Sequence, residues 1–451
     1  MTQKIQQTLR DSAVARWSAM VIVSFTMMCG YFITDVMAPL EDMLINDLGW
    51  TSSEYGFFSG AYGYINVFLL MLFFGGIILD KCGIRVTGVM SCSLMLIGAL
   101  IKWFALDNSF GDTEMFGYPL QVILASLGFA IFGVGAEITG ITVTKVIAKW
   151  FTGYEMALAM GLQVAMARIG TAAALAGSLP FAKWMGNISA PLLLGSALLC
   201  IGLTSYLVYC VLDRKLDASA QAAETSNEDE EFKLSDIKFI LTNKGFWLIT
   251  LLCLMFYAGV FPFLKFATKL MIYKYGVEPE LAGLIPAMLP FGTILLTPLF
   301  GSIYDRKGKG ATLMIIGSVM LAIVHILFAL PLLNVWWFAI FIMVILGIAF
   351  SLVPSAMWPS VPKIIPLKQL GTAYSIIFYI QNIGLSMVPV LIGWVIENYS
   401  VVTNANGEIT NYDYTIPMSI FAVFGFIAIA ISVMLKNEDG KKNYGLEQKN
   451  V

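Results

Sequence analysis

The chain has 451 residues, of which 58% are hydrophobic and only 12% are charged. Soluble domains carry about 25% charged residues, so this composition excludes an ordinary water-soluble protein and indicates an integral membrane protein. The formal net charge of −2 excludes nucleic acid as a partner, because binding to phosphates requires a basic surface.

Apolar runs long enough to cross a bilayer recur along the chain. A helix that crosses a hydrocarbon core of about 30 Å needs about 20 apolar residues. The first run begins at Trp17 and lacks the cleavage pattern of a signal peptide, so we expect it to remain as the first span. The predicted spans cover residues 17–40, 53–79, 86–105, 118–147, 155–184, 189–213, 245–270, 279–303, 310–331, 334–361, 370–397 and 416–436. The sequence therefore predicts an all-α membrane protein with twelve transmembrane helices.

A polar segment between the sixth and seventh spans divides the chain into two halves. It contains the acidic run Glu228-Asp229-Glu230-Glu231 and has the low hydrophobicity of a linker. We predict an N-terminal six-helix bundle over residues 1–213, a cytosolic linker over 214–244, a C-terminal six-helix bundle over 245–436 and a cytosolic tail over 437–451.

The distribution of basic residues predicts the orientation in the membrane. Lysine and arginine gather at span ends on the side of the two termini, as at Lys81, Arg85 and Lys149, whereas opposite loops carry acids such as Asp107 and Glu408. Because cytosolic loops are enriched in lysine and arginine, both termini are predicted to lie in the cytosol.

The two halves repeat a motif at equivalent span junctions. Its copies lie 225 residues apart and read Gly76-Ile-Ile-Leu-Asp80-Lys81-Cys-Gly83-Ile-Arg85 and Gly301-Ser-Ile-Tyr-Asp305-Arg306-Lys-Gly308-Lys309. An acid near a tight glycine turn, with a basic cluster beside it, can latch neighbouring spans on the cytosolic side and stabilise the outward-open state. The alternative is a topology anchor alone, since the basic residues also follow the positive-inside rule.

This double motif resembles the hallmark of the major facilitator superfamily. Further segments resemble its lysosomal dipeptide uniporter branch and the prokaryotic relatives of that branch. These segments are Gly30-Tyr31-Phe32 with Asp35, Gly135 with Glu137, Trp150-Phe151, Gly161-Leu162-Gln163, Met166-Ala167-Arg168-Ile169-Gly170, Val260-Phe261-Pro262-Phe263, Gln369-Leu370-Gly371-Thr372-Ala373-Tyr374 and Ile380-Gln381-Asn382-Ile383-Gly384-Leu385.

The resemblance implies two pseudo-symmetric six-helix bundles around a central cavity that opens alternately to either side. It also implies facilitated movement of dipeptides, with Glu137 and Arg168 holding the two ends of the substrate. Lys265 departs from the expected pattern and puts the side-chain preference in question. The N-terminal tail lacks the acidic di-leucine sorting signal of a lysosomal member, so a plasma (inner) membrane location is expected.

Glu137 and Arg168 also stand out from the residues alone, because ionisable groups inside spans usually mark function. Arg168 lies roughly 22 Å from the cytosolic start of its span, and Glu137 lies roughly 12–18 Å in. A planar guanidinium can grip a carboxylate, and a carboxylate can accept an ammonium group. The alternative is a structural ion pair that touches no substrate. A small organic anion, for which Arg168 alone would suffice, and proton-coupled symport both remain open.

Asp35 and the eleventh span supply further candidates. Asp35 is either a cavity-mouth carboxylate or proton acceptor, or an interfacial cap. Internal alignment places Asn382 at the position equivalent to Arg168, beside Gln381 and Tyr379, with an interhelical hydrogen bond as the alternative role. Aromatic candidates for the cavity wall are Tyr31, Tyr257, Phe261 and Trp358.

An enzyme is not expected, because the chain has one histidine, His325, and neither an H-E-x-x-H motif nor a phosphate-binding loop. The six cysteines are scattered without metal-ligand spacing, so neither a metal nor a cofactor is predicted. The expected partners are the bilayer and a small-molecule substrate. The expected unit is a monomer, and the sequence identifies no accessory subunit.

Overall fold

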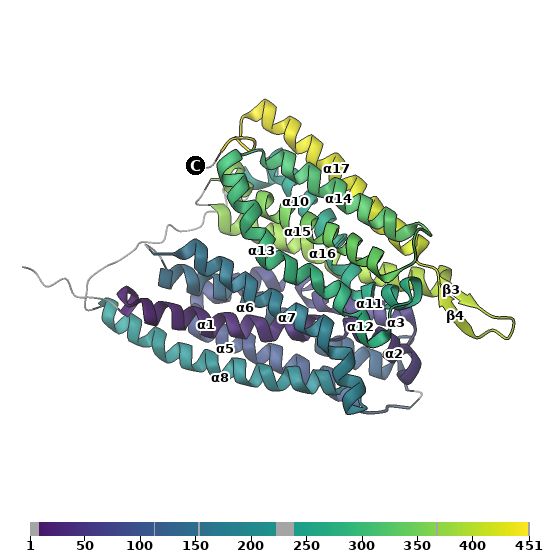
Figure 1. The fold of residues 1–451 in the computed structure, drawn as a ribbon. Coiled ribbons are helices and arrows are strands. Elements are labelled where there is room, and N and C mark those ends of the chain that lie inside the picture. The colour runs from purple at the N-terminus through teal and green to yellow at the C-terminus, as the bar shows by residue number, and fades with distance from the viewer. Residues whose placement is uncertain (1–8, 112, 152–153, 222–238, 367–368, 450–451) are drawn as a thin grey trace, which may run out of the picture.

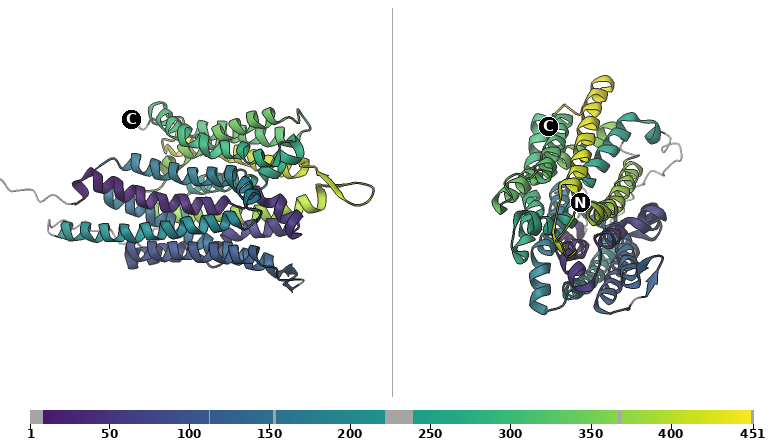
Figure 2. Two further views of the ribbon diagram at one scale, coloured as in Figure 1. Left: turned by 60° about the horizontal axis from the view of Figure 1, so that its bottom comes forward. Right: turned by 90° about the vertical axis from the view of Figure 1, so that its right-hand side faces the viewer.

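The computed structural model describes residues 9–111, 113–151, 154–221, 239–366 and 369–449. Its long helices run side by side in two groups, one from each half of the chain (Figure 1). A β-hairpin, formed by β3 (Val401–Thr403) and β4 (Ile409–Tyr412), projects from one end (Figure 2). We call that end the hairpin face. The opposite end, where α8 ends and α10 begins, is called the linker face.

In the N-terminal half, α5 packs on α6 and α8, and α1 packs on α7 and α8. The hydroxyl of Ser12 caps α1, and Thr51 with Glu54 forms a capping box at the start of α3. The elements are η1 (Leu9–Asp11), α1 (Ala13–Asp35), η2 (Ala38–Leu40), α2 (Glu41–Leu48), α3 (Ser52–Gly60), η3 (Ala61–Gly63), α4 (Tyr64–Phe68), α5 (Met71–Asp107), β1 (Glu114–Met115), β2 (Tyr118–Pro119), α6 (Leu120–Phe151), α7 (Met156–Met185) and α8 (Ala190–Gln221).

In the C-terminal half, α14 packs on α15 and α17, α13 packs on α15, and α10 packs on α16 and α17. Strands β3 and β4 pair antiparallel, with Val401 opposite Tyr412. The helices are α10 (Lys244–Ala258), α11 (Phe261–Tyr275), α12 (Pro279–Ala282), α13 (Leu284–Lys307), α14 (Gly310–Ala329), α15 (Trp336–Ile364), α16 (Leu370–Tyr399) and α17 (Thr415–Lys442).

Among the described residues, 11 helices are long and apolar enough to cross a membrane, and the number rises to 12 if the bent pair Ser52–Phe68 and Met71–Leu79 forms one span. The prediction of an all-α membrane protein is confirmed. Helices α8 and α17 run beyond their apolar cores, because their last turns are polar and need no lipid around them.

The second span is not the continuous helix that the apolar run 53–79 predicts. It bends by 60° at the break between Phe68 and Met71, where Leu70 adopts a left-handed backbone conformation with φ 55°. The hydroxyl of Tyr379, on α16, donates to the carbonyl of Val67 beside this break at 3.2 Å. A polar partner is needed there, because a broken helix exposes backbone groups that lipid cannot satisfy.

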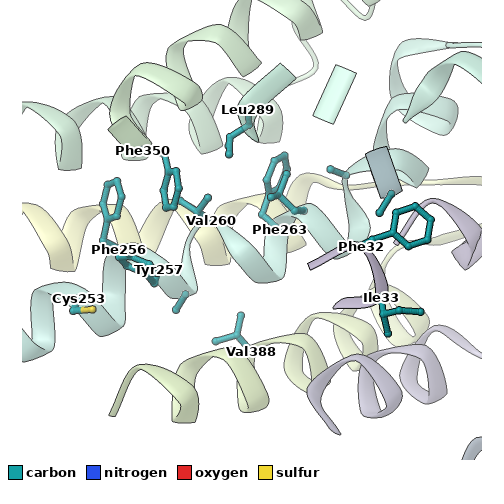
Figure 3. Packing of buried hydrophobic residues seen from close by; sticks show 14 of the residues in the cluster. Phe32, Ile33, Cys253, Phe256, Tyr257, Val260, Phe263, Leu289, Phe350 and Val388 are labelled. Carbon is teal, nitrogen blue, oxygen red and sulfur yellow. The ribbon is translucent and has the colours of Figure 1, made fainter. Parts of the chain in front are cut away.

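The seventh span is also broken, between α10 and α11. Pro262 lies in the first turn of α11 and has no N–H to donate to α10, so the hydrogen bonding between the two helices is interrupted there. The buried His325 bonds through Nε2 to the carbonyl of Gly259 at 2.8 Å and satisfies the exposed backbone of the break. Figure 3 shows Phe256, Tyr257 and Phe263 packed on either side of this break.

The two halves meet closely at the hairpin face, where α3 packs against α16. A Cβ atom added to Gly56 would lie 2.5 Å from the carbonyl oxygen of Pro389, and one added to Gly60 would lie 2.3 Å from that of Ser386. One added to Gly393 would meet the carbonyl oxygen of Ser52 at 2.3 Å. Small residues thus let the two helix backbones touch, and they close this face.

At the linker face, residues 443–449 fold back onto the C-terminal half as a C-terminal strap. Leu446 is fully buried, and its carbonyl accepts the N–H of Gly310 at 2.8 Å. The Glu447 carboxylate accepts the backbone N–H and the hydroxyl of Thr312, both at 2.8 Å. The strap therefore caps the N-terminus of α14, where a negative charge is stabilised by the helix dipole.

Candidate functional site

The cavity between the halves consists of two adjoining hollows of about 1000 and 800 Å³. Both are lined by Tyr31, Tyr62, Glu137 and Trp358. The larger hollow extends along α5, α6 and the first turns of α16 toward the linker face, and the smaller one reaches toward the hairpin face. Because close packing shuts the hairpin face and the larger hollow extends toward the linker face, we infer that the cavity opens at the linker face.

Glu137 lies on the cavity-facing side of α6. Its carboxylate accepts a hydrogen bond from the Tyr62 hydroxyl at 2.9 Å, and the Asn382 side chain of α16 lies close to it. Asn382 itself is almost fully buried, and its Nδ2 donates to the carbonyl of Phe378 at 3.0 Å. Glu137 is thus held by one neutral donor of its own half, the Tyr62 hydroxyl, and it lies beside an amide of the other half.

Arg168 lies on α7 and faces the smaller hollow. Its guanidinium is surrounded by aromatic rings, with ring centroids at 5.9 Å for Tyr31, 5.3 Å for Phe261 and 5.2 Å for Phe350. Such contacts stabilise a cation without neutralising it. Two of the three rings belong to the C-terminal half, so Arg168 reaches across the cavity.

Glu137 and Arg168 do not form the mutual ion pair that was the alternative to substrate binding. Within the described part of the chain, neither side chain takes part in any ion pair. One acid and one base therefore face the same cavity, each without an opposite charge.

The C-terminal half supplies an aromatic wall to the cavity. Trp358 donates its Nε1–H to the Tyr257 hydroxyl at 3.0 Å, which fixes both rings. Phe261 and Phe350 pack edge-to-face with centroids 5.3 Å apart. The sequence predicts Tyr257, Phe261 and Trp358 for this wall but not Phe350, because phenylalanine is too frequent in the spans for its position to stand out.

Asp35 forms an inter-half ion pair with Lys265, whose Nζ lies 2.7 Å from Oδ1. A second pair, Glu41 with Lys269 at 3.5 Å, is almost completely buried nearby. Both pairs join the α1–α2 region to α11. Neither suggested role for Asp35 included such a partner, because the partner lies in the other half of the chain. Asp35 lines the smaller hollow, but its charge is already matched.

The eleventh-span candidates fall into three places. Gln381 lines the smaller hollow and accepts a weak hydrogen bond from the Cys253 thiol at 3.5 Å. Asn382 lines neither hollow, and its buried side chain lies close to Glu137 and donates to the carbonyl of Phe378. Tyr379 also lines neither hollow, because its hydroxyl is turned to the break in the second span.

The two repeated motifs lie at the linker face. Arg85 bonds to the carboxylates of Asp213 at 3.6 Å and Asp217 at 3.0 Å, and Lys149 bonds to the same two acids. The Asp80 side chain lies outside the described residues, and Lys81 is exposed. Gly76 lines the larger hollow.

In the second copy of the motif, Gly301 lines the smaller hollow. Asp305 is half-buried and Arg306 is exposed.

Sequence reasoning missed Tyr62, which bonds to Glu137, and Lys265 as the partner of Asp35. A tyrosine between Ala61 and Gly63 gives little signal in a chain with 18 tyrosines. No group of three or more His, Cys, Asp or Glu side chains suited to a metal occurs in the ranges that the structure describes.

Comparison with known proteins identifies the family. The model of the Major Facilitator Superfamily matches residues 20–387 and 263–450. The chain is 28% identical over 396 residues to the lysosomal dipeptide transporter MFSD1 of Bos taurus, covering 85% of this chain and 80% of the relative. It is 29% identical over 398 residues to MFSD1 of Mus musculus, covering 84% and 80%.

Solved structures share the fold at low sequence identity. A POT family transporter in complex with 5-aminolevulinic acid has a TM-score of 0.69 at 14% identity, with 96% of this chain and 99% of that chain covered. The nucleoside transporter NupG has a TM-score of 0.68 at 17% identity, with 93% and 99% covered. The resemblance seen in the repeated motif is therefore confirmed, and the chain belongs to the Major Facilitator Superfamily of secondary transporters.

Proposed function

We propose that this transporter carries dipeptides by alternating access, as a facilitative uniporter. The observation that carries the proposal is the pair of unmatched charges, Glu137 and Arg168, facing one cavity. A dipeptide is a zwitterion whose ammonium suits Glu137 and whose carboxylate suits the guanidinium of Arg168. Binding would satisfy both charges at once.

The relatives support the same substrate class, since the MFSD1 proteins are named as lysosomal dipeptide transporters. A small organic anion is the second candidate, but it would use Arg168 and leave the Glu137 carboxylate without a cation. Proton-coupled peptide symport is the other alternative. Since Asp35 is paired with Lys265, Glu137 is the better candidate for a proton carrier in that mechanism.

We assign the linker face to the cytosol, because the basic span ends gather there. The structure would then be the inward-open state of a monomer in the plasma (inner) membrane. The two repeated motifs would act as latches when this face closes.

The test is uptake of a labelled dipeptide into liposomes that contain the purified protein, with and without an inward proton gradient. Arg168→Ala removes the proposed carboxylate partner, and Lys183→Ala is the matched control, since Lys183 lies in an exposed ion pair. Uptake that does not depend on the proton gradient, and that is lost in Arg168→Ala but not in the control, supports the uniporter mechanism. Gradient-driven uptake supports symport. No uptake over a broad dipeptide panel refutes peptide transport.

A further inference from the structure

Tyr62 lies in η3, the short turn that joins α3 to α4 in the second span. Its hydroxyl is 2.9 Å from Oε1 of Glu137. Its ring packs against Phe129 and Phe132 of α6, with centroids 5.6 and 6.4 Å away. These rings and the hydroxyl contact fix the orientation of Tyr62 above the carboxylate.

The close approach of η3 to α6 depends on Gly133. A Cβ atom there would lie 1.9 Å from the Tyr62 carbonyl oxygen, so no other residue permits this contact. Gly133 and Glu137 are four residues apart and share one face of α6. The backbone of η3 therefore rests one turn away from Glu137, within reach of the Tyr62 side chain.

On its other side, η3 packs against α16 of the C-terminal half. A Cβ atom on Gly63 would lie 1.9 Å from Ser386 Oγ and 3.3 Å from the Asn382 carbonyl oxygen. The same turn of α16 thus contacts η3 and carries Asn382, whose side chain lies close to Glu137. The η3 turn therefore lies between Glu137 of the N-terminal half and α16 of the C-terminal half.

We propose that Tyr62 is a positioning residue that holds the Glu137 carboxylate toward the cavity, where it receives the ammonium group of the substrate. This proposal rests on the proposed function. An ionised carboxylate has about four lone-pair sites, and Tyr62 occupies one of them. The remaining sites stay available to the three donors of an ammonium group. A carboxylate whose direction is fixed before binding loses less freedom when the substrate arrives.

The experiment uses the full-length protein and two variants that each lose a single hydroxyl. Tyr62→Phe removes the bond to Glu137. Tyr64→Phe is the matched control, because the Tyr64 hydroxyl lies two residues away and donates to the Phe57 carbonyl at 3.0 Å. Calorimetric titration measures the affinity for alanyl-alanine and for N-acetyl-alanyl-alanine, which keeps the carboxylate and lacks the ammonium.

Tyr62→Phe should weaken binding of alanyl-alanine about tenfold, the size of one lost hydrogen bond to a charged group. Binding of the acetylated peptide should not change, and Tyr64→Phe should alter neither. In liposome uptake, Tyr62→Phe should raise KM and leave turnover within about twofold. In a Glu137→Gln background, Tyr62→Phe should have no further effect, because the two residues act as one unit.

Equal losses for both peptides, or additive losses in the double variant, would overturn the proposal, because Tyr62 would then act elsewhere than on Glu137. Wild-type affinity in Tyr62→Phe would overturn it as well. If the wild-type protein binds and transports no dipeptide, the proposed function fails and this proposal fails with it. The wild-type arm therefore separates the two failures.

Discussion

Gly56→Ala should favour separation of the two halves at the hairpin face. The added Cβ would lie 2.5 Å from the Pro389 carbonyl oxygen and 3.0 and 3.3 Å from the Gly393 Cα and N. Ordinary contact begins at 3.4 Å, so α3 and α16 must part by 3.4 − 2.5 = 0.9 Å. Because all three atoms belong to the backbone, no side-chain rotation can relieve the overlap.

The expected cost falls on the state in which this face is closed. Overpacking a close contact costs about 1–3 kcal/mol, and about 2 kcal/mol changes a population ratio roughly thirtyfold. In the proposed alternating access, α3 would separate from α16 in the opposite state, so that state would escape the cost. Gly56→Ala should therefore shift the population toward opening at the hairpin face and slow uptake.

Electron paramagnetic resonance measures distances between spin labels, and these distances report the population of the state that is open at the hairpin face. Labels at Asn108 and Leu281, exposed sites of the two halves, would report the hairpin face in a background without the native cysteines. Gly177→Ala is the matched control, since its added Cβ meets no atom within 4 Å. A distance distribution for Gly56→Ala identical to that of Gly177→Ala would refute the idea that this glycine contact keeps the face closed.

Three further results are expected. Arg168→Lys keeps the charge but loses the planar fork, so dipeptide uptake in liposomes should fall at least tenfold. Reversal of one charge by Asp35→Lys should leave two buried cations together and abolish uptake, and adding Lys265→Asp should restore part of it. Glu447→Ala removes the cap on the Thr312 backbone N–H, and should lower the thermal unfolding midpoint in detergent by about 2 °C without a change in substrate affinity.

For each of these three predictions, one outcome would contradict the reasoning. Wild-type uptake by a well-folded Arg168→Lys protein would show that the fork is not needed. An exposed pair, Lys183 with Glu280, is the control for charge reversal, and equal effects at both pairs would deny a special role for the buried one. An unchanged unfolding midpoint for Glu447→Ala would show that the C-terminal strap adds no stability.

The course of the spans could be predicted because the bilayer imposes a length and an apolar composition. The breaks within them could not all be predicted. Leu69 and Leu70 continue an apolar run, and nothing in their chemistry indicates that the helix bends there. Pro262 does carry such a signal, but a proline near a helix start is also compatible with an unbroken span after a kink.

The candidate site was predictable where a charge interrupts an apolar run. Glu137 and Arg168 are conspicuous for that reason, and the structure places both on the cavity. The partners of such charges were not predictable. Lys265 lies 230 residues from Asp35, and Tyr62 lies 75 residues from Glu137. Contacts of that kind follow from the packing of helices, which no local spacing encodes.

The C-terminal strap has a consequence for biosynthesis. Glu447 follows Thr312 by 135 residues, so α14 enters the membrane long before its cap has been translated. Until α17 is in place, the first N–H groups of α14 must be hydrated at the membrane surface. Contacts of such long sequence separation form late in folding. The C-terminal strap therefore docks on α14 only after that helix has been inserted into the membrane. The time at which the α14 N-terminus becomes protected from hydrogen exchange would show when the strap docks.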